Sequence, residues 1–289
     1  MAYIIFDLEW NQPASAGETV LEPVFLTGEI VEIGAVKLDQ DFRVVDDLRL
    51  YIRPQYYKKM HRYLASLTGI RDKDLQEKGL DFPAAYEKFT DWCGQAPVYM
   101  TWSLSDLPVL AENLALHGLT VDFPDCVDLQ RIFGREIMRE NRRYALDDAL
   151  AVLGEQGEAA HDALHDARNT AKVCDHLDLD DYLDEYVTRP FVLRSDGRLF
   201  LTAAQYRSDE KLRRFACPWC GEETVCEPWV PMGSWEQMAM AVCPEGDEFL
   251  VTMADQRMPE GGYRVKRMAY EMSDDLWELY CQRKEAAKV

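Results

Sequence analysis

Apolar residues divide the first 185 positions of the chain into short runs and longer periodic segments. The short runs predict five strands, near residues 3–9, 29–38, 47–53, 97–102 and 125–128. Apolar residues at helical spacing predict helices near 82–94, 107–118, 129–140, 145–153 and 162–177. Three strands precede the first helix, which indicates an antiparallel meander, and the later alternation of strand and helix indicates parallel crossovers. The pattern therefore predicts an α/β fold with a mixed sheet.

The pattern changes after about Tyr186. Arg189-Pro190 interrupts the helical periodicity, and the apolar residues around Asp196-Gly197 predict a hairpin. The remaining sequence predicts a small β-rich module that ends in a helix from about 273 to 286. We therefore expect two domains, residues 1–187 and residues 188–289.

Length and composition are those of a globular protein. With 289 residues, of which 47% are hydrophobic, the chain can form one full core and a smaller unit. No apolar run approaches the ~20 residues of a membrane span. The first residues lead into a strand without a basic leader, and the eight cysteines are scattered along the chain. We expect a cytoplasmic protein with no membrane partner.

Two carboxylates, Asp7 and Glu9, stand at the end of the first predicted strand, in the run YIIFDLEW at 3–10. Residues two apart in a strand point to the same face, so both acids project side by side. Two like charges this close cost free energy unless a cation or a proton compensates them. Hard cations such as Mg²⁺ bind carboxylate oxygens, often together with substrate phosphate. The pair is a candidate site for metal-dependent phosphoryl transfer, and a solvated strand exit is the alternative.

A third acid, Asp106, follows the fourth predicted strand. It stands where it can cap the helix that runs to about His117. A helix N-terminus at the carboxyl end of a strand is also where α/β proteins bind ligands. Asp106 is therefore a helix cap alone, or a cap that also belongs to a ligand site.

A fourth acid, Asp166, lies in the segment AHDALHDARNTA at 160–171. Small and apolar residues recur there at helical spacing and predict a face that packs closely on a sheet; they are Ala163, Leu164, Ala167, Thr170, Ala171 and Cys174. Such a close approach would bring Asp166 towards Asp7 and Glu9.

Two histidines accompany Asp166. His161 lies five residues before it, at the start of the helix, where it could take a proton from an attacking water. A structural role is the alternative for a lone histidine. His165 adjoins Asp166 in sequence and is expected to point elsewhere, at the surface.

Three motifs resemble those of the DEDDh 3′→5′ exonucleases, in the same order and with similar separations. They are FDLEW at 6–10, TWSLSD at 101–106 and HDALHDAR at 161–168. Residues 28–36, GEIVEIGAV, resemble the second strand of that family, and residues 67–70, LTGI, resemble its nucleotide-contacting loop. The resemblance covers about residues 1–185 and is nearest to the histone-mRNA 3′-end exonucleases and their bacterial relatives.

The resemblance implies a ribonuclease H-like fold with helices on both faces of a mixed five-stranded sheet. It implies release of nucleoside 5′-monophosphates from single-stranded 3′ ends, RNA before DNA, with two Mg²⁺ or Mn²⁺ ions. The catalytic residues that it implies are Asp7, Glu9, Asp106, His161 and Asp166. The four acids would be metal ligands and His161 the general base.

By the same resemblance, the terminal nucleotides would contact Leu8, Trp10, Leu67 and Thr68. The alternative to an enzyme is a non-catalytic adaptor that keeps the exonuclease fold and binds nucleic acid or a protein. The presence of all five motif side chains favours the enzyme.

The charge limits the mode of binding. The chain has 32 basic and 52 acidic residues, a net charge of −20, whereas proteins that grip duplex DNA over many phosphates are basic where they bind. A 3′-exonuclease needs only a few nucleotides in a cleft where metal ions supply positive charge. We expect a short footprint with little sequence readout.

The C-terminal module contains cysteines at the spacing of a zinc ribbon. Cys217-Pro218-Trp219-Cys220 resembles one knuckle, and Cys243-Pro244-Glu245-Gly246 resembles the other with a glycine in place of its last cysteine. A fourth ligand would have to be Cys226, an acidic residue or water, and the four-cysteine set predicts one structural zinc. The alternative is a degenerate ribbon without zinc, which could bind a protein partner.

Overall fold

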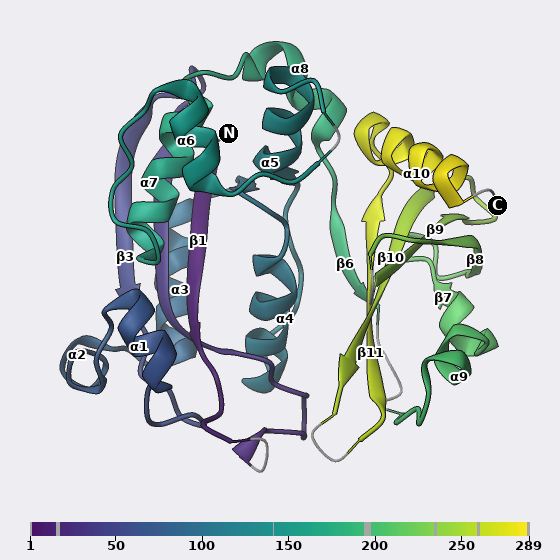
Figure 1. The fold of residues 1–289 in the computed structure, drawn as a ribbon, viewed down its shortest axis with the longest axis horizontal. Helices are drawn as coiled ribbons and strands as arrows, with labels where there is room; N and C mark the ends of the chain where they lie inside the picture. The colour runs from purple at the N-terminus through teal and green to yellow at the C-terminus, as the bar shows by residue number, and fades with distance from the viewer. Residues whose placement is uncertain are drawn as a thin grey trace. The chain divides into compact units, whose positions relative to one another are not determined.

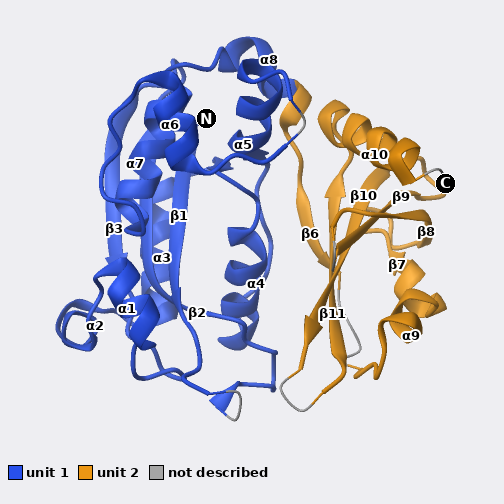
Figure 2. Ribbon diagram, in the orientation of Figure 1, with its two compact units in different colours: residues 1–184 blue, residues 185–289 orange. Residues whose placement is uncertain are grey.

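The computed structural model describes residues 2–15, 18–140, 142–193, 198–233, 236–258 and 261–287. The chain divides into two compact units, Met1–Asp184 and Glu185–Val289 (Figure 2). No helix among the described residues is long and apolar enough to cross a membrane.

The first unit contains a five-stranded sheet with the order β3-β2-β1-β4-β5. Its strands are β1 (Tyr3–Asn11), β2 (Glu29–Leu38), β3 (Val44–Tyr51), β4 (Val98–Thr101) and β5 (Cys126–Asp128). The β1–β2 and β2–β3 pairs are antiparallel, and the β1–β4 and β4–β5 pairs are parallel. The mixed sheet, with its meander and its parallel crossovers, is confirmed.

Eight α-helices are described in or at the end of this unit. They are α1 (Arg62–Thr68), α2 (Asp72–Lys78), α3 (Phe82–Cys93), α4 (Asp106–Leu116), α5 (Leu129–Ile132), α6 (Leu146–Leu153), α7 (Ala163–Cys174) and α8 (Leu179–Tyr186). A π-helical turn, Phe133–Ile137, follows α5, where the sequence predicted one helix over 129–140.

The alternation of side chains along β1 separates the core from the site. Phe6 points to α3, where its ring centroid lies 5.8 Å from that of Phe89. Asp7 follows Phe6 and therefore points to the opposite face, which α7 covers. Figure 1 shows α7 in front of the sheet and α3 behind it. The ribonuclease H-like arrangement of helices on both faces is thus present.

The second unit contains a six-stranded antiparallel sheet with the order β6-β11-β10-β9-β8-β7. Its elements are β6 (Pro190–Leu193), α9 (Ala203–Arg207), a 3₁₀ turn (Glu210–Arg213), β7 (Arg214–Ala216), β8 (Glu223–Pro231), β9 (Glu236–Val242), β10 (Glu248–Arg257), β11 (Tyr263–Glu271) and α10 (Asp274–Ala287). The predicted β-rich module and its final helix are confirmed, while the turn expected at Asp196-Gly197 lies outside the described residues.

Candidate active site

Four acidic side chains from three parts of the first unit converge beside β1. Asp7 and Glu9 lie on β1, Asp106 is the first residue of α4, and Asp166 lies in the first turn of α7. Asp106 Oδ1 accepts a hydrogen bond of 3.2 Å from the backbone N–H of Leu8. This bond fixes the start of α4 against β1 between the two strand acids.

Asp106 is not the helix cap that local sequence suggested. Ser105 occupies the N-cap position of α4, and no side-chain capping bond is formed there. Asp106 is 7% exposed and directs its carboxylate to β1 instead. A buried carboxylate that does not cap its helix is better explained by a ligand site.

Burial and mutual repulsion raise the pKa values of these acids. Burial raises the pKa of Asp7 well above its ordinary value, and the charges of Asp106 and Asp166 add to the effect. Burial, followed by the charge of Asp166, raises the pKa of Glu9 to about 8. Burial raises the pKa of Asp106 to about 7, against the opposing hydrogen bond from Leu8. The cluster is electrostatically unfavourable without a bound cation or protons.

These raised pKa values, caused by burial first and by repulsion second, predict an unusual pH dependence of stability. An acid whose pKa is raised by folding stabilises the protein least at high pH, because the unfolded state gains more by losing its proton. The pKa of Glu9 is raised from 4.5 to about 8. The thermal midpoint of protein dialysed free of divalent ions should therefore decrease as the pH is raised from about 4.5 to about 8. Asp7→Asn should flatten this fall, the exposed Asp91→Asn should not, and Mg²⁺ should restore the wild-type midpoint at pH 8. Equal slopes for the two variants would contradict a raised pKa at Asp7.

A glycine on β2 allows α7 to reach the acids. Gly34 pairs with Asp7 in the sheet register. A Cβ atom at Gly34 would lie 2.0 Å from the backbone nitrogen of Leu164 and 2.1 Å from the carbonyl carbon of Ala163. Because no real Cβ comes so close, the first turn of α7, which carries Asp166, can rest on the sheet only over a glycine.

Gly34→Ala should therefore displace the first turn of α7. We expect a loss of about 1–3 kcal/mol in the free energy of unfolding, as for other overpacked sites. Gly233→Ala is a matched control, because a Cβ there meets nothing within 4 Å. Urea unfolding measures both changes, and a wild-type stability for Gly34→Ala would contradict this contact.

His161 lies beside two of the acids. Its backbone N–H donates to Asp166 Oδ2 at 2.9 Å. The nearest ligand atoms of His161, Glu9 and Asp166 all lie within 4.8 Å of one another. The residue is exposed and adopts a left-handed backbone with φ 64°, which is uncommon for a residue with a side chain. The structure thus places a solvent-accessible imidazole at the edge of the acidic cluster.

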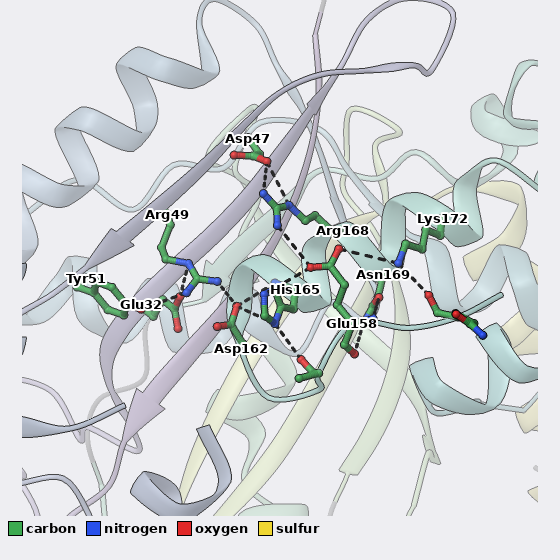
Figure 3. A network of polar contacts seen from close by, with 12 residues as sticks. Glu32, Asp47, Arg49, Tyr51, Glu158, Asp162, His165, Arg168, Asn169 and Lys172 are labelled. Carbon is green, nitrogen blue, oxygen red and sulfur yellow. Dashed lines mark hydrogen bonds and ion pairs between the residues drawn. The ribbon is translucent and has the colours of Figure 1, made fainter. Parts of the chain in front are cut away.

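An ion-pair chain fixes the start of α7 (Figure 3). Arg49 on β3 lies between Glu32 on β2 and Asp162, with its Nε 3.3 Å from Glu32 Oε1 and its other end paired to Asp162. Asp162 caps α7 by accepting the N–H of His165 at 3.0 Å. Since Asp162 follows His161 directly, this chain ties the position of His161 to the sheet.

Residues of α7 also hold the loop before His161. The side chain of Asn169 accepts the N–H of Glu158 at 2.7 Å and donates to its carbonyl at 3.2 Å. His165 Nδ1 lies 3.3 Å from the carbonyl oxygen of Ala159, and its Nε2 lies 3.4 Å from Glu158 Oε2. His165 therefore makes its contacts in this loop, as a partly buried structural residue and not as a free surface side chain.

The sequence analysis missed Glu32, Arg49 and Asn169. Glu32 gave one signal, because it is a charge within a strand that is otherwise nearly all apolar. Burial, followed by the charge of Asp162, raises its pKa to about 7, while Arg49 opposes the shift. No local pattern pointed to Arg49 or Asn169. The partners of Arg49 lie far away in sequence, and Asn169 bonds to backbone atoms, which leave no trace in the sequence.

Comparison with known protein families matches residues 4–174 to the model of the exonuclease family, RNase_T. The chain belongs to the exonuclease family. The DEDDh resemblance drawn from the three motifs is thereby confirmed. None of the curated proteins compared with the chain matches it.

Solved structures show the same fold in other exonucleases. The nuclease domain of 3′hExo, a DEDDh family member bound to rAMP, is 21% identical, with a TM-score of 0.52 over 62% of this chain and 92% of that chain. A 3′-exonuclease described in 3′-end specific recognition of a histone mRNA stem-loop is 19% identical, with a TM-score of 0.54 over 70% and 91%. Cell-death related nuclease 4 is 18% identical, with a TM-score of 0.54 over 75% and 74%. At these identities the likeness shows the fold.

The acidic cluster fits the divalent metal ions that DEDDh exonucleases generally use. Its four carboxylates are hard oxygen donors, which suit Mg²⁺ or Mn²⁺. Their raised pKa values show that positive charge at this place would be favourable.

The residues expected to contact nucleotides differ in how accessible they are to a ligand. Leu8 is 3% exposed, and its N–H is bonded to Asp106, so neither its side chain nor its N–H is available to a ligand. A bulge in the β1–β2 pairing falls between Glu9 and Trp10, and the half-buried Trp10 ring lies over Gly28, where a Cβ would be 2.2 Å from Cδ1. Leu8 is therefore a core residue, and Trp10 remains partly exposed.

Leu67 and Thr68 lie in the last turn of α1, and not in a loop as the resemblance suggested. Gly69 ends the helix with a left-handed φ of 73°. The Thr68 hydroxyl donates to the Leu64 carbonyl at 2.9 Å and accepts from the Ile70 N–H at 3.1 Å. Both residues are half-buried, so their exposed parts lie on a fixed helix end.

Proposed function

We propose that the chain is a 3′→5′ exonuclease that removes nucleoside 5′-monophosphates from single-stranded 3′ ends, RNA in preference to DNA. The observation that carries the proposal is the convergence of Asp7, Glu9, Asp106 and Asp166 with the exposed His161. Two structural neighbours are described with rAMP or a histone mRNA, which supports RNA as the preferred substrate.

The acids would hold two Mg²⁺ or Mn²⁺ ions. Asp7, Glu9 and Asp166 would bind one ion, Asp7 would also reach the second, and Asp106 would bind mainly through water. When bound, these ions make a water molecule more acidic and neutralise charge on the leaving 3′ oxygen. The hydrogen bond from the Leu8 N–H to Asp106 and the close packing of the first turn of α7 on Gly34 would set the donor positions before substrate arrives.

His161 would accept the proton of the attacking water at a ring nitrogen. Its exposure gives that proton a way to solvent, and its bond to Asp166 holds it at the cluster. Trp10, Leu67 and Thr68 would contact the terminal bases with their exposed faces, where stacking is worth ~1–3 kcal/mol per base and tolerates any sequence.

The two domains would have different roles, with a boundary close to the division between the two compact units. Residues 1–187 would form the exonuclease domain and residues 188–289 an accessory domain that contacts longer substrates or a protein partner. A non-catalytic adaptor is disfavoured, because an adaptor has no need to keep four mutually repelling acids and a histidine together.

Blocking the 3′ hydroxyl tests the proposal. A 3′-phosphate should slow degradation of a single-stranded RNA strongly, because the terminal hydroxyl is the end from which cleavage starts. The same RNA with a free 3′ end and its DNA counterpart serve as controls on denaturing gels. Equally fast cleavage of the blocked or a circular RNA would identify an endonuclease instead.

A further inference from the structure

Two turns of the second unit bring three thiols and a carboxylate together. Cys217 and Cys220 lie between β7 and β8, and Cys243 and Asp247 lie between β9 and β10. One ligand atom from each of the four lies within 4.8 Å of the others. None of the exonuclease residues belongs to this group.

The separations are those of a tetrahedral zinc site. With Zn–S near 2.3 Å and Zn–O near 2.0 Å, tetrahedral angles place two sulfurs about 3.8 Å apart and a sulfur and an oxygen about 3.5 Å apart. Cys220 Sγ lies 3.8 Å from Cys243 Sγ. Asp247 Oδ2 lies 3.5 Å from Cys217 Sγ and 3.0 Å from Cys243 Sγ. Two of the three separations match, and the third requires a shift of about half an ångström.

The backbone explains why the fourth ligand is Asp247. In the first turn, the Cys217 N–H donates to the Glu222 carbonyl at 2.9 Å, five residues on. In the second turn, the Cys243 N–H donates to the Asp247 carbonyl at 2.9 Å, only four residues on. Each turn passes through a left-handed glycine, Gly221 with φ 78° and Gly246 with φ 99°.

The second turn is thus a copy of the first that is one residue shorter. The position of Cys220 is missing, and the residue after the glycine supplies a carboxylate instead. The Asp247 N–H also points to Cys243 Sγ, at 3.3 Å, and such bonds stabilise a thiolate ligand.

Cys226, which the sequence analysis placed in the ligand set, does not join this group. It lies on β8 opposite Ala241 of β9, and its side chain is fully buried in the apolar core of the second sheet. Burial raises the pKa of its thiol to about 12, which opposes the thiolate that zinc requires.

We propose that Cys217, Cys220, Cys243 and Asp247 bind one Zn²⁺ that joins the β7–β8 turn to the β9–β10 turn. Three thiolates and one carboxylate fill all four positions of zinc, which is typical of a structural site. The four ligands come from turns at one end of the sheet, so the ion would stabilise the second unit without acting in catalysis.

Elemental analysis of the full-length protein, purified and dialysed with excess Mg²⁺, tests the proposal. We expect about one zinc per chain in the wild type and in Asp7→Asn, which excludes the acidic cluster as its source. Cys226→Ala should keep the zinc, and Asp247→Ala and Cys220→Ser should lose most of it. Asp247→Cys should keep it, because a fourth thiolate can replace the carboxylate.

Cobalt provides a readout that does not depend on how the variants fold. Wild type stripped of zinc should bind one Co²⁺ and show the visible bands of a tetrahedral ion with thiolate charge transfer, and one equivalent of Zn²⁺ should remove them. The thermal midpoint should rise on zinc addition. A wild type with neither zinc nor these bands would overturn the proposal, as would stoichiometric iron, or zinc loss in Cys226→Ala with retention in Asp247→Ala.

Discussion

Asp7→Asn is expected to abolish exonuclease activity while the protein stays folded. Asp7 is buried within the acidic cluster, and after burial the charges of Asp106, Asp166 and Glu9 each raise its pKa further. Removing it takes away the ligand that would be shared by both metal ions, and metal ions contribute several kcal/mol of charge stabilisation. Because each 1.36 kcal/mol is tenfold in rate, we expect a loss of about 10³-fold or more.

The substitution should not unfold the chain, because it removes repulsion. In the absence of divalent ions, Asp7→Asn should be at least as stable as the wild type at pH 8. Initial rates on a labelled RNA, measured beside the exposed control Asp91→Asn, give the comparison. A rate for Asp7→Asn within a few-fold of the wild type would remove Asp7 from the catalytic site.

His161→Asn should lose most of the rate with the metal site intact. A positioned general base contributes about 10²–10⁴-fold. Asparagine suits this position because it tolerates the left-handed backbone that His161 adopts at φ 64°. The backbone N–H of the substituted residue can still donate to Asp166, so the loss of rate can be assigned to the missing imidazole.

His165→Asn is the matched control for this variant. The asparagine side-chain amide can still donate to the Ala159 carbonyl in place of Nδ1, and the substitution removes the rest of the imidazole ring. We expect it to retain at least a third of the wild-type rate, and both variants to show the wild-type thermal shift with Mg²⁺. Equal losses in the two variants, or a lost thermal shift in His161→Asn alone, would contradict the role of His161 as base.

The fold was predictable where the sequence has a strong apolar period. The strands of the mixed sheet were found because they contain short apolar runs, most of which are buried, and the small-residue face of α7 was found because its buried residues recur at helical spacing. Helices α1 and α2 were missed for the opposite reason, since α1 buries no residue and α2 buries only Leu75. The π-helical turn after α5 was missed because its apolar spacing is close to that of an α-helix.

The approach of Asp166 to Asp7 and Glu9 was predictable from the spacing within β1 and α7, whereas Asp106 and His161 were predicted from their places beside a strand and a helix and from the motif resemblance. Their supports depend on contacts that no local pattern shows. Arg49 pairs with Glu32 and also with Asp162, which lies 113 positions further along the chain, and the need for Gly34 depends on the helix that packs over it. The fourth position beside Cys217, Cys220 and Cys243 shows the same limit, since the sequence left Cys226, an acidic residue or water open and only the backbone of the shortened turn brings Asp247 there.

Analysis of the products from a 5′-labelled single-stranded RNA with a free 3′ hydroxyl tests the central claim most directly. With Mg²⁺ or Mn²⁺, the wild type should give a ladder that shortens by one nucleotide at a time, with nucleoside 5′-monophosphates as the released species in mass spectrometry. Asp7→Asn should leave the RNA at full length. Internal fragments, release of 3′-monophosphates, or the same ladder from Asp7→Asn would contradict a 3′→5′ exonuclease built on this acidic cluster.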